Sequence, residues 1–511
     1  MDRPIQHIVI VGGGTAGWLT AGVIAARHKA RMASGFKVTL VESPNVAIIG
    51  VGEGTWPTMR TTLEKMGVSE TEFFRHCDTA FKQGGKFVGW TTGAPDDAYY
   101  HPLMLPHGWS QVNLVPHWLQ DGRGRTFSAA VCPQEAICEE GLAPKTIATP
   151  EYRGLANYAY HLDAGKFASF MQKHCTEKLG VHHVLADVTE VKQDESGDIT
   201  GLVTEQAGEI TGDMFVDCTG FRALLIEKTL GVGFKDCRDV LFCDTALAIQ
   251  VPHESDDAPM ASQTIATAQS SGWIWDIALP TRRGLGYVYS SDHIDEEAAR
   301  AELARYAGTQ AEARKIPIRS GHREMFWKNN CVAVGLAAGF LEPLEASAIM
   351  LIELSAKIIA DQLPARRSVM DVVARRFNEV THYRWGRIID FLKLHYVLTQ
   401  RTDTAFWRDN VDPASTPERL QDLLRLWKYR APWFLDEFDR LEEVFPAASY
   451  QYVLYGMGFR TEVDPVENSA DALLASRIME ENAAMAQKMR ANLPKNRDLV
   501  RKIRDHGMQS I

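Results

Sequence analysis

The sequence predicts an α/β protein with a Rossmann-like, dinucleotide-binding core and a largely helical second lobe. The core is indicated by an apolar, β-branched run at residues 8–11 that leads into Gly12-x-Gly14-x-x-Gly17 and then into the apolar start of a helix. A second apolar run at residues 36–41 ends at Glu42, which completes a β-α-β unit. Amphipathic leucine patterns after about residue 370 predict the helical lobe.

Each glycine of the N-terminal loop has a predicted role. Gly12 allows a tight turn, Gly14 lets the backbone approach a pyrophosphate, and Gly17 lets the helix pack closely on the strand. The helix N-terminus would face the phosphates, and Glu42 stands where an acidic residue would hold a ribose hydroxyl. The sequence has no second loop of this kind, so we expect one bound dinucleotide.

Composition excludes several classes of function. The formal net charge of −10 argues against a nucleic-acid partner, because phosphate binding needs a basic surface. No apolar run reaches the length of a membrane span, so we expect a cytoplasmic protein without a membrane partner. The eight cysteines are scattered, with no Cys-x-x-Cys pair and no zinc-like spacing, which predicts reduced thiols and no metal site.

The core is expected to be discontinuous. We predict an FAD-binding core at residues 1–90 and 160–370, and a substrate-covering, mostly helical lobe at 91–159 and 371–511. FAD is favoured over NAD because the glycine loop lies at the N-terminus and two later apolar strands end at residues 217–220 and 335–339. Chains that fold around an extended FAD return several strands to the cofactor in this way. Ligands of such folds bind at the carboxyl ends of the parallel strands, between the lobes. The pattern alone therefore indicates an FAD-dependent oxidoreductase.

Four segments together resemble the flavin-dependent tryptophan/indole halogenases. They are GGGTAGW at residues 12–18, FK at 81–82 with KFVGW at 86–90, GWIWDI at 272–277 and FLEPLE at 340–345. The resemblance implies chlorination or bromination of an indole or tryptophan-like aromatic, with reduced FAD (FADH2), O2 and halide as reactants. Hypohalous acid would be delivered to a lysine, and a separate flavin reductase would supply the FADH2.

The resemblance also implies the roles of individual residues. The catalytic pair would be Lys82, which holds the electrophilic halogen, and Glu345, whose carboxylate assists proton loss from the ring. Lys86 lies four residues after Lys82, a spacing that predicts one shared face, but it is not expected to be catalytic. Ser347 and Ala348 fall where the family binds halide, although the family more often has Thr and Gly there. The implied cofactor-binding residues are Gly12, Gly14, Thr15, Ala16, Gly17, Glu42, Glu53, Val188, Leu336 and Ile349.

The substrate pocket is implied to include His101, Trp273, Trp275 and Phe445. The two tryptophans would wall the region between flavin and substrate, and alternation along a strand puts both on one face. Residues 428–456 are shorter than the segment with which the family clamps free tryptophan, and Phe445 would stand in for a ring-sandwiching tryptophan. We therefore expect indole, an indole-bearing small molecule or a tryptophan within a peptide to be at least as good a substrate as free tryptophan.

Two alternatives stay open at this stage. A flavin-dependent aromatic monooxygenase would transfer oxygen directly to the ring, and a flavin-binding protein without catalysis would act as a regulator or partner. Lys82 and the tryptophan pair argue against the first, while retention of both Lys82 and Glu345 argues against the second. The sequence leaves open the halide preference, the ring position attacked and the oligomeric state, for which a homodimer is one option.

Overall fold

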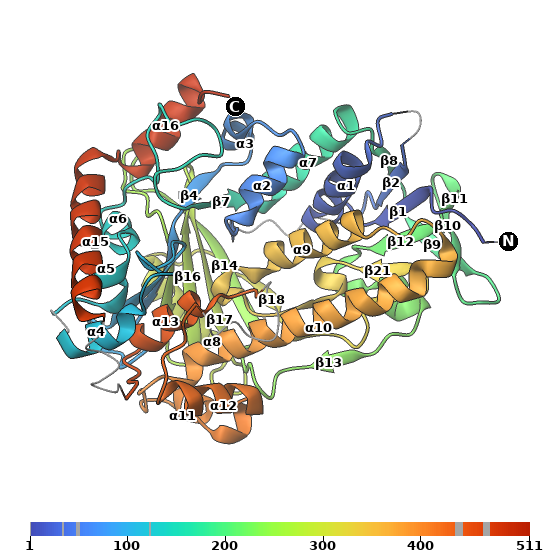
Figure 1. The fold of residues 1–511 in the computed structure, drawn as a ribbon. Coiled ribbons are helices and arrows are strands. Elements are labelled where there is room, and N and C mark those ends of the chain that lie inside the picture. The colour runs from blue at the N-terminus through green and yellow to red at the C-terminus, as the bar shows by residue number, and fades with distance from the viewer. Residues whose placement is uncertain are drawn as a thin grey trace. The chain divides into compact units, whose positions relative to one another are not determined.

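The protein forms two compact units, each built from three stretches of chain (Figure 1). The structure, a computed structural model, describes residues 2–32, 35–46, 52–121, 124–434, 443–462 and 471–510. Unit 1 comprises residues 1–79, 162–237 and 319–385, and unit 2 comprises residues 80–161, 238–318 and 386–511.

Unit 1 contains the predicted Rossmann-like sheet. Its six strands follow the order β20-β21-β12-β1-β2-β8 and are parallel except for the β20–β21 pair. The strands are β20 (Trp327–Lys328), β21 (Cys331–Ala333), β12 (Met214–Asp217), β1 (His7–Val11), β2 (Lys37–Glu42) and β8 (His182–Leu185). The central strand β1 is almost wholly apolar and buried, as a strand covered on both faces requires. The α/β fold class is therefore confirmed.

Helices pack beside this sheet. Helix α1 (Thr15–His28) packs against α7 (Ala164–Glu177) and α9 (Ser347–Asp361). The other elements that lie wholly or partly in unit 1 are α2 (Thr58–Lys65), α3 (Glu70–His76), α10 (Arg367–Val397, to residue 385), β3 (Gly52–Gly54), β9 (Val188–Gln193), β10 (Ile199–Thr204), β11 (Gly208–Thr211), β13 (Phe234–Asp236), β19 (Gly321–Arg323) and β22 (Gly339–Phe340).

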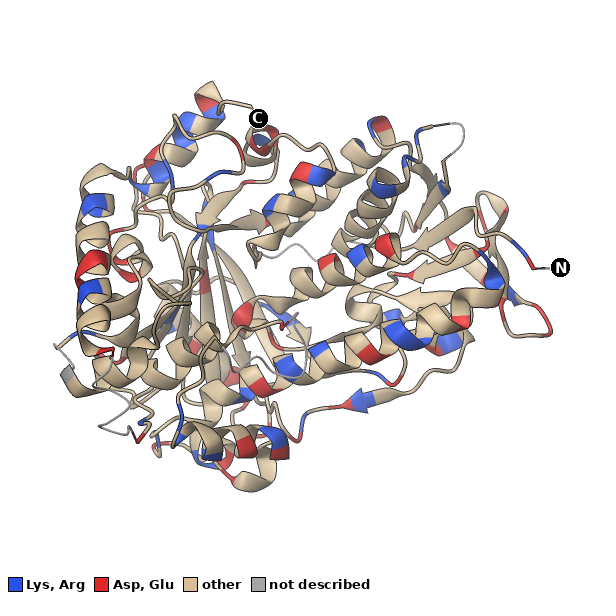
Figure 2. Ribbon diagram, in the orientation of Figure 1, with Lys and Arg blue, Asp and Glu red and all other residues tan. Residues whose placement is uncertain are grey.

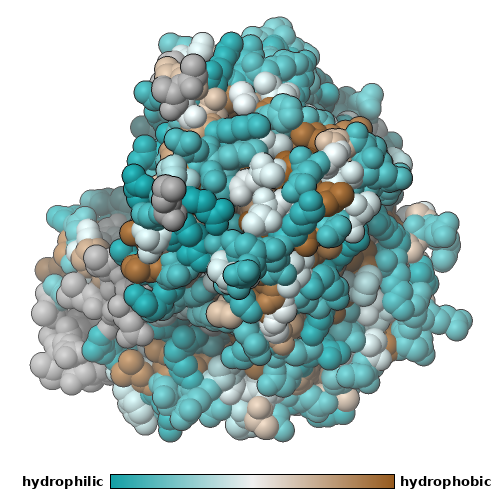
Figure 3. Space-filling view, turned by 90° about the vertical axis from the view of Figure 1, so that its right-hand side faces the viewer, coloured by the Kyte–Doolittle hydropathy of each residue, from teal (hydrophilic) through white to brown (hydrophobic). Residues whose placement is uncertain are grey.

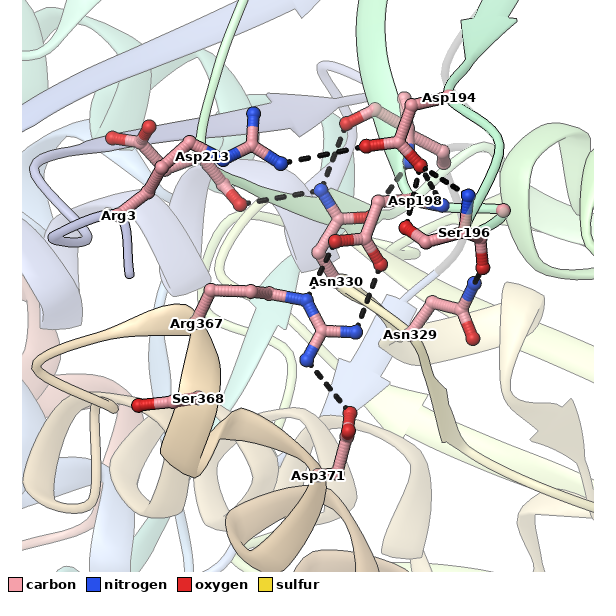
Figure 4. A network of polar contacts seen from close by, with 12 residues as sticks. Arg3, Asp194, Ser196, Asp198, Asp213, Asn329, Asn330, Arg367, Ser368 and Asp371 are labelled. Carbon is pink, nitrogen blue, oxygen red and sulfur yellow. Dashed lines mark hydrogen bonds and ion pairs between the residues drawn. The ribbon is translucent and has the colours of Figure 1, made fainter. Parts of the chain in front are cut away.

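A polar network joins stretches of unit 1 that lie far apart in the sequence (Figure 4). Arg367, the first residue of α10, donates two hydrogen bonds to the carboxylate of Asp198, at 2.6 and 2.9 Å. The buried amide of Asn330 donates to the carbonyl oxygens of Ile199 and Asp213, at 2.8 and 3.2 Å. Because the groups in these contacts are buried or half-buried, the bonds are worth more than solvent-exposed ones, and they stabilise a unit assembled from three stretches of chain.

Unit 2 is built on a seven-stranded sheet in the order β18-β14-β17-β16-β15-β5-β6, antiparallel except between β15 and β5. The strands are β18 (Arg314–Pro317), β14 (Thr245–Pro252), β17 (Arg282–Tyr289), β16 (Gly272–Ala278), β15 (Thr264–Ala268), β5 (Gly84–Val88) and β6 (Ala98–Pro102). Helix α8 (Glu296–Ala307) packs Ala299 and Leu303 into the same apolar cluster as Leu247 and Leu285 of this sheet.

The remaining elements of unit 2 are mostly helical. They are β4 (Ala80–Lys82), β7 (Ala159–Asp163, to residue 161), α4 (Leu114–Asp121), α5 (Phe127–Val131), α6 (Gln134–Glu139), the later part of α10, α11 (Ala405–Asn410), α12 (Glu418–Trp427), α13 (Ala447–Gly456), α15 (Ala472–Asn492) and α16 (Asn496–His506). The division differs from the predicted domains chiefly at residues 238–318, which the sequence pattern places in the core. They join unit 2 because β14 to β17 form one continuous sheet with β5 and β6.

Charged residues of both signs occur along helices such as α10 and α16 (Figure 2). The face drawn in Figure 3 is mostly hydrophilic, with hydrophobic residues scattered over it. Within the described part of the chain, no helix is both long and apolar enough to cross a membrane.

Candidate active site

The N-terminal glycine loop connects β1 to α1 with the backbone geometry of a phosphate-binding turn. Gly12 has a φ of 117°, and a Cβ atom there would overlap the carbonyl oxygen of Cys218. A Cβ at Gly17 would overlap the carbonyl oxygen of Gly12, so the helix passes directly over the turn. A Cβ at Gly14, in contrast, would meet no atom of the described residues within 4 Å. Packing within the protein thus requires glycine at positions 12 and 17, whereas the space beside Gly14 is open among the described residues.

That open space fits a pyrophosphate. Gly14 is the N-cap residue of α1 and, as a glycine, has no side chain that could cap the helix. The first amides of a helix need an acceptor, and an anion at the N-terminus supplies one. Thr15 and Ala16 form the first turn, and Gly335 of the neighbouring loop, with a φ of 69°, approaches the side chain of Ala16 closely. This brings Leu336 near the same helix start.

Glu42 lies at the end of β2, beside the glycine loop. A Cβ built on Gly13 would overlap its side chain, and its Oε2 atom is 2.9 Å from Nε2 of His183 on β8. The parallel pairing of β2 with β8 creates this contact, which the sequence did not indicate. Glu42 therefore has a half-buried position and a protein partner, and its contact with a ribose stays a prediction.

The other predicted cofactor residues of unit 1 lie on separate elements. Burial raises the pKa of Glu53, on β3, to about 7, so its carboxyl is partly protonated at neutral pH. Val188 begins β9, and Ile349 is buried in the first turn of α9. Their roles in holding the cofactor stay predictions.

Lys82 ends the short strand β4 and is buried, with 5% of its surface exposed. In the antiparallel pairing of β4 with β7, Ala80 lies opposite His161 and Lys82 opposite Ala159. Residues two apart on a strand share a face, so Lys82 and His161 are diagonal neighbours on one face of this pair. A buried lysine is unusual, and its position indicates a role other than solubility.

His161 is a functional candidate that sequence reasoning missed. It is fully buried, and its Nε2 lies 2.8 Å from Oγ1 of Thr264. Burial, together with the positive charge of Lys82, lowers its pKa well below the ordinary value, so the imidazole is neutral. The missed signal was the strand pairing, because 79 positions separate the two residues and no local pattern connects them.

Lys86 behaves differently from Lys82. Its Nζ is 2.7 Å from Oε1 of Glu139, which also accepts a 2.5 Å hydrogen bond from the hydroxyl of Tyr100. The prediction of one shared face for Lys82 and Lys86 is wrong, because the chain changes sheets between them. Lys82 belongs to β4 and Lys86 to β5. Between them, the backbone N–H of Gln83 donates a hydrogen bond to the carbonyl oxygen of Ser262.

Glu345 lies at a sharp turn immediately before α9. Pro343–Glu345 form one 3-10 turn, Ala346 has a left-handed φ of 52°, and α9 begins at Ser347. Glu345 and Ser347 are both buried. The N-cap residue of α9, Ala346, makes no side-chain cap hydrogen bond, so the amides of the first turn, including those of Ser347 and Ala348, are suited to an anion. The carboxylate and the predicted halide site are thus adjacent in the chain.

The predicted substrate residues lie in unit 2. His101 on β6 has its Nε2 2.9 Å from Oγ of Ser449, and its ring lies near those of Phe391, Phe445 and Tyr452, with centroids 5.6 to 6.4 Å away. Phe445 is stacked on Phe391 with ring centroids 3.7 Å apart, so one face of Phe445 is covered by the protein. The structure therefore brings His101 and Phe445 into one aromatic cluster.

Trp273 and Trp275 lie on β16, both buried, with their rings 6.4 Å apart in an edge-to-face arrangement. Gly286 on the paired strand leaves room for the ring of Trp275, because a Cβ there would overlap it. The indole N–H of Trp273 is buried and has no hydrogen-bond partner among the described residues. Such a donor is costly unless a ligand or water accepts from it.

The predicted site residues are divided between the units. The glycine loop, Glu42, Glu53, Val188, Leu336 and residues 345–349 belong to unit 1, while Lys82, His101, Trp273, Trp275 and Phe445 belong to unit 2. Across the described residues, no group of three or more His, Cys, Asp or Glu side chains is arranged to hold a metal ion.

The Rossmann-like core with its glycine loop defines the class as a dinucleotide-binding α/β protein. Residues 7–472 match the model of the tryptophan halogenase family. A crystal structure of a tryptophan halogenase from Shewanella frigidimarina is 47% identical, with a TM-score of 0.96, and the match covers 100% of this chain and 99% of that one. The chain belongs to the tryptophan halogenase family and is a flavin-dependent halogenase.

Two further relatives span nearly the same length. The tryptophan 6-halogenase SttH of Streptomyces toxytricini is 35% identical over 480 residues, which cover 89% of this chain and 90% of SttH. BrvH, a flavin-dependent halogenase from Brevundimonas sp. BAL3, is 34% identical with a TM-score of 0.86, covering 98% of this chain and 99% of that one. The hydroxylase alternative is not favoured, since these relatives are named as halogenases.

Proposed function

We propose that the protein chlorinates or brominates an indole or tryptophan-like aromatic, using FADH2, O2 and halide. The observation that carries this proposal is Lys82, a buried lysine beside a neutral histidine. The ammonium of an ordinary lysine is solvated, whereas a buried one can hold a reactive polar molecule by hydrogen bonds or give up its proton. The family match supports the same reaction class.

In this proposal the glycine loop and Glu42 hold the FAD, and the first amides of α9 at Ser347 and Ala348 hold the halide. Bound FADH2, with O2 and halide, supplies hypohalous acid. Lys82 then holds this acid through its ammonium or, as a neutral amine, exchanges one N–H hydrogen for halogen with release of water. The ring takes up the electrophilic halogen and loses a proton with the help of the Glu345 carboxylate, so that the net change is one C–H bond replaced by one C–halogen bond.

We further propose that a separate flavin reductase supplies the FADH2, because the sequence contains one dinucleotide loop. The proposed substrate is an indole-bearing small molecule or a tryptophan within a peptide. The short segment at residues 428–456 and the covered face of Phe445 support a pocket unlike one that clamps free tryptophan.

The experiment supplies FADH2, O2 and bromide or chloride with indole, free tryptophan and tryptophan peptides, and identifies products by mass spectrometry. Lys82→Ala should lower halogenation by about 100-fold or more while flavin binding is retained. Lys86→Ala is the matched control, since Lys86 is a neighbouring lysine paired with Glu139, and it should change the rate by about twofold at most. A hydroxylated product without a halogenated one, or unchanged activity of Lys82→Ala, would overturn the proposal.

A further inference from the structure

The peptide bond between Glu345 and Ala346 is held at both of its polar atoms. The carbonyl oxygen of Glu345 accepts a hydrogen bond of 2.9 Å from the indole N–H of Trp56. The amide of Ala346 donates one of 3.0 Å to the carbonyl oxygen of Pro343. Ala346 is left-handed, with a φ of 52°, a conformation that is unfavourable for a residue with a Cβ and persists only where its surroundings enforce it.

The helix that follows Trp56, α2, is attached to α9. Trp56 immediately precedes Pro57 and α2, and two threonines of α2 contact the buried carboxyl of Glu353 on α9. The hydroxyl of Thr62 is 2.6 Å from Oε1 of Glu353, and that of Thr58 is 3.3 Å from Oε2. Because α2 is anchored to α9 in this way, the position of Trp56 relative to the turn is determined by more than one contact.

The held peptide plane lies between two parts of the proposed machinery. On one side is the side chain of Glu345, and on the other are the first amides of α9, at Ser347 and Ala348. A rotation of this plane would move the carboxylate and the amides together. Catalytic groups must stay within fractions of an ångström of the productive geometry, so a bond that prevents this rotation affects the reaction.

We propose that Trp56 is a positioning residue, which holds Glu345 and the first turn of α9 through its hydrogen bond to the Glu345 carbonyl. The inference rests on the proposed function for its catalytic consequence, since the roles of Glu345 and of the halide site belong to that proposal. It adds a residue that the sequence reasoning did not single out.

The test removes only the hydrogen bond. Trp56→Phe keeps an aromatic ring without the N–H, and replacement of Trp56 by benzothienylalanine keeps the size and shape of indole with sulfur in place of the N–H. The matched control is Trp327→Phe, also in unit 1, whose indole donates a 3.1 Å hydrogen bond to the carbonyl of Asn329. Trp327 is more deeply buried than Trp56, so a general effect of losing an indole would be at least as large there.

Two readouts are measured. Hydrogen exchange of peptides covering residues 343–350, followed by mass spectrometry, should be about fivefold faster in both Trp56 variants and unchanged in Trp327→Phe. In steady-state halogenation, the KM for bromide should rise by about fivefold and kcat should fall in the Trp56 variants, while both constants stay within about twofold in the control. The benzothienylalanine variant decides the matter if Trp56→Phe does not fold.

Unchanged exchange at residues 343–350 in the benzothienylalanine variant would overturn the inference. Faster exchange with unchanged KM for bromide and unchanged kcat would also overturn it, because the bond would then hold the turn without serving the reaction. Failure of the wild-type enzyme to halogenate any substrate would instead contradict the proposed function, and the exchange result would still decide whether Trp56 holds the turn.

Discussion

The glycine loop of unit 1 and the aromatic cluster of unit 2 are built in opposite ways. The loop uses backbone from a few consecutive residues, Gly12 to Gly17, and its shape follows from contacts of main-chain atoms. The aromatic cluster instead joins His101 to Phe391, Phe445 and Ser449, which are up to 348 positions away in the sequence. A site made of consecutive backbone is readable from a short motif, whereas a site made of distant side chains depends on how the whole unit packs.

The strongest test of this contrast is Gly17→Ala in the loop. The new Cβ would overlap the carbonyl oxygen of Gly12, and neither backbone segment can move without displacing α1 from β1. We expect a loss of more than about 3 kcal/mol of stability, or failure of unit 1 to fold, together with loss of flavin binding. Thermal unfolding by circular dichroism and flavin fluorescence would measure both effects.

Gly14→Ala is the matched control, because a Cβ there meets no atom within 4 Å in the described part of the chain and the backbone, at φ −78° and ψ −173°, is open to alanine. The stability of the flavin-free protein should stay within about 0.5 kcal/mol of wild type, while FAD affinity falls. FAD affinity equal to that of the wild type would show that Gly14 does not face the pyrophosphate.

In the aromatic cluster, the corresponding change is Phe445→Ala. The side chain is buried and stacked on Phe391, so its removal leaves a cavity in unit 2. We expect a loss of about 4 kcal/mol, measured by urea unfolding, whereas Phe445→Leu should lose about 1 to 2 kcal/mol. Equal and small losses of unfolding free energy in both variants would mean that the stack of Phe445 on Phe391 contributes little to the stability of unit 2.

Glu353→Gln changes a contact between side chains of unit 1 that lie far apart in the sequence, those of Glu353 and Thr62. It therefore tests whether the stability of unit 1 also depends on groups brought together by packing. Burial raises the pKa of Glu353 to about 8, above its ordinary value of 4.5. Between these values the folded protein holds a proton that the unfolded chain has lost, so the carboxyl lowers stability increasingly as pH rises from about 4.5 to 8. Gln cannot ionise, and its amide oxygen can still accept from Thr62.

The variant should therefore be more stable than wild type at pH 8, by on the order of a few kcal/mol, and nearly equal to it at pH 5. Unfolding temperatures measured across this pH range would show the difference. A constant gap between the two proteins at all pH values would contradict the raised pKa of Glu353.

Other features of the site show how far sequence reasoning reached. The fold class and the glycine loop were predictable, because strand, turn and helix follow one another within residues 7–28. The assignment of residues 238–318 and the separation of Lys82 from Lys86 were not, because both depend on which strands pair. Local periodicity cannot show that a chain changes sheets at one residue, as it does at Gln83.

The sequence by itself determined the residues whose requirement is local: Gly17, where a Cβ would overlap the backbone of its own loop, and a proline-led turn before the helix that begins at Ser347. Only the tertiary structure decided that Lys82 is buried beside a neutral His161, and that the indole of Trp56 binds the Glu345 carbonyl 289 positions away. The physical reason is that backbone sterics act over a few residues, whereas burial, pKa and long-range hydrogen bonds arise from groups that become neighbours only when the chain packs.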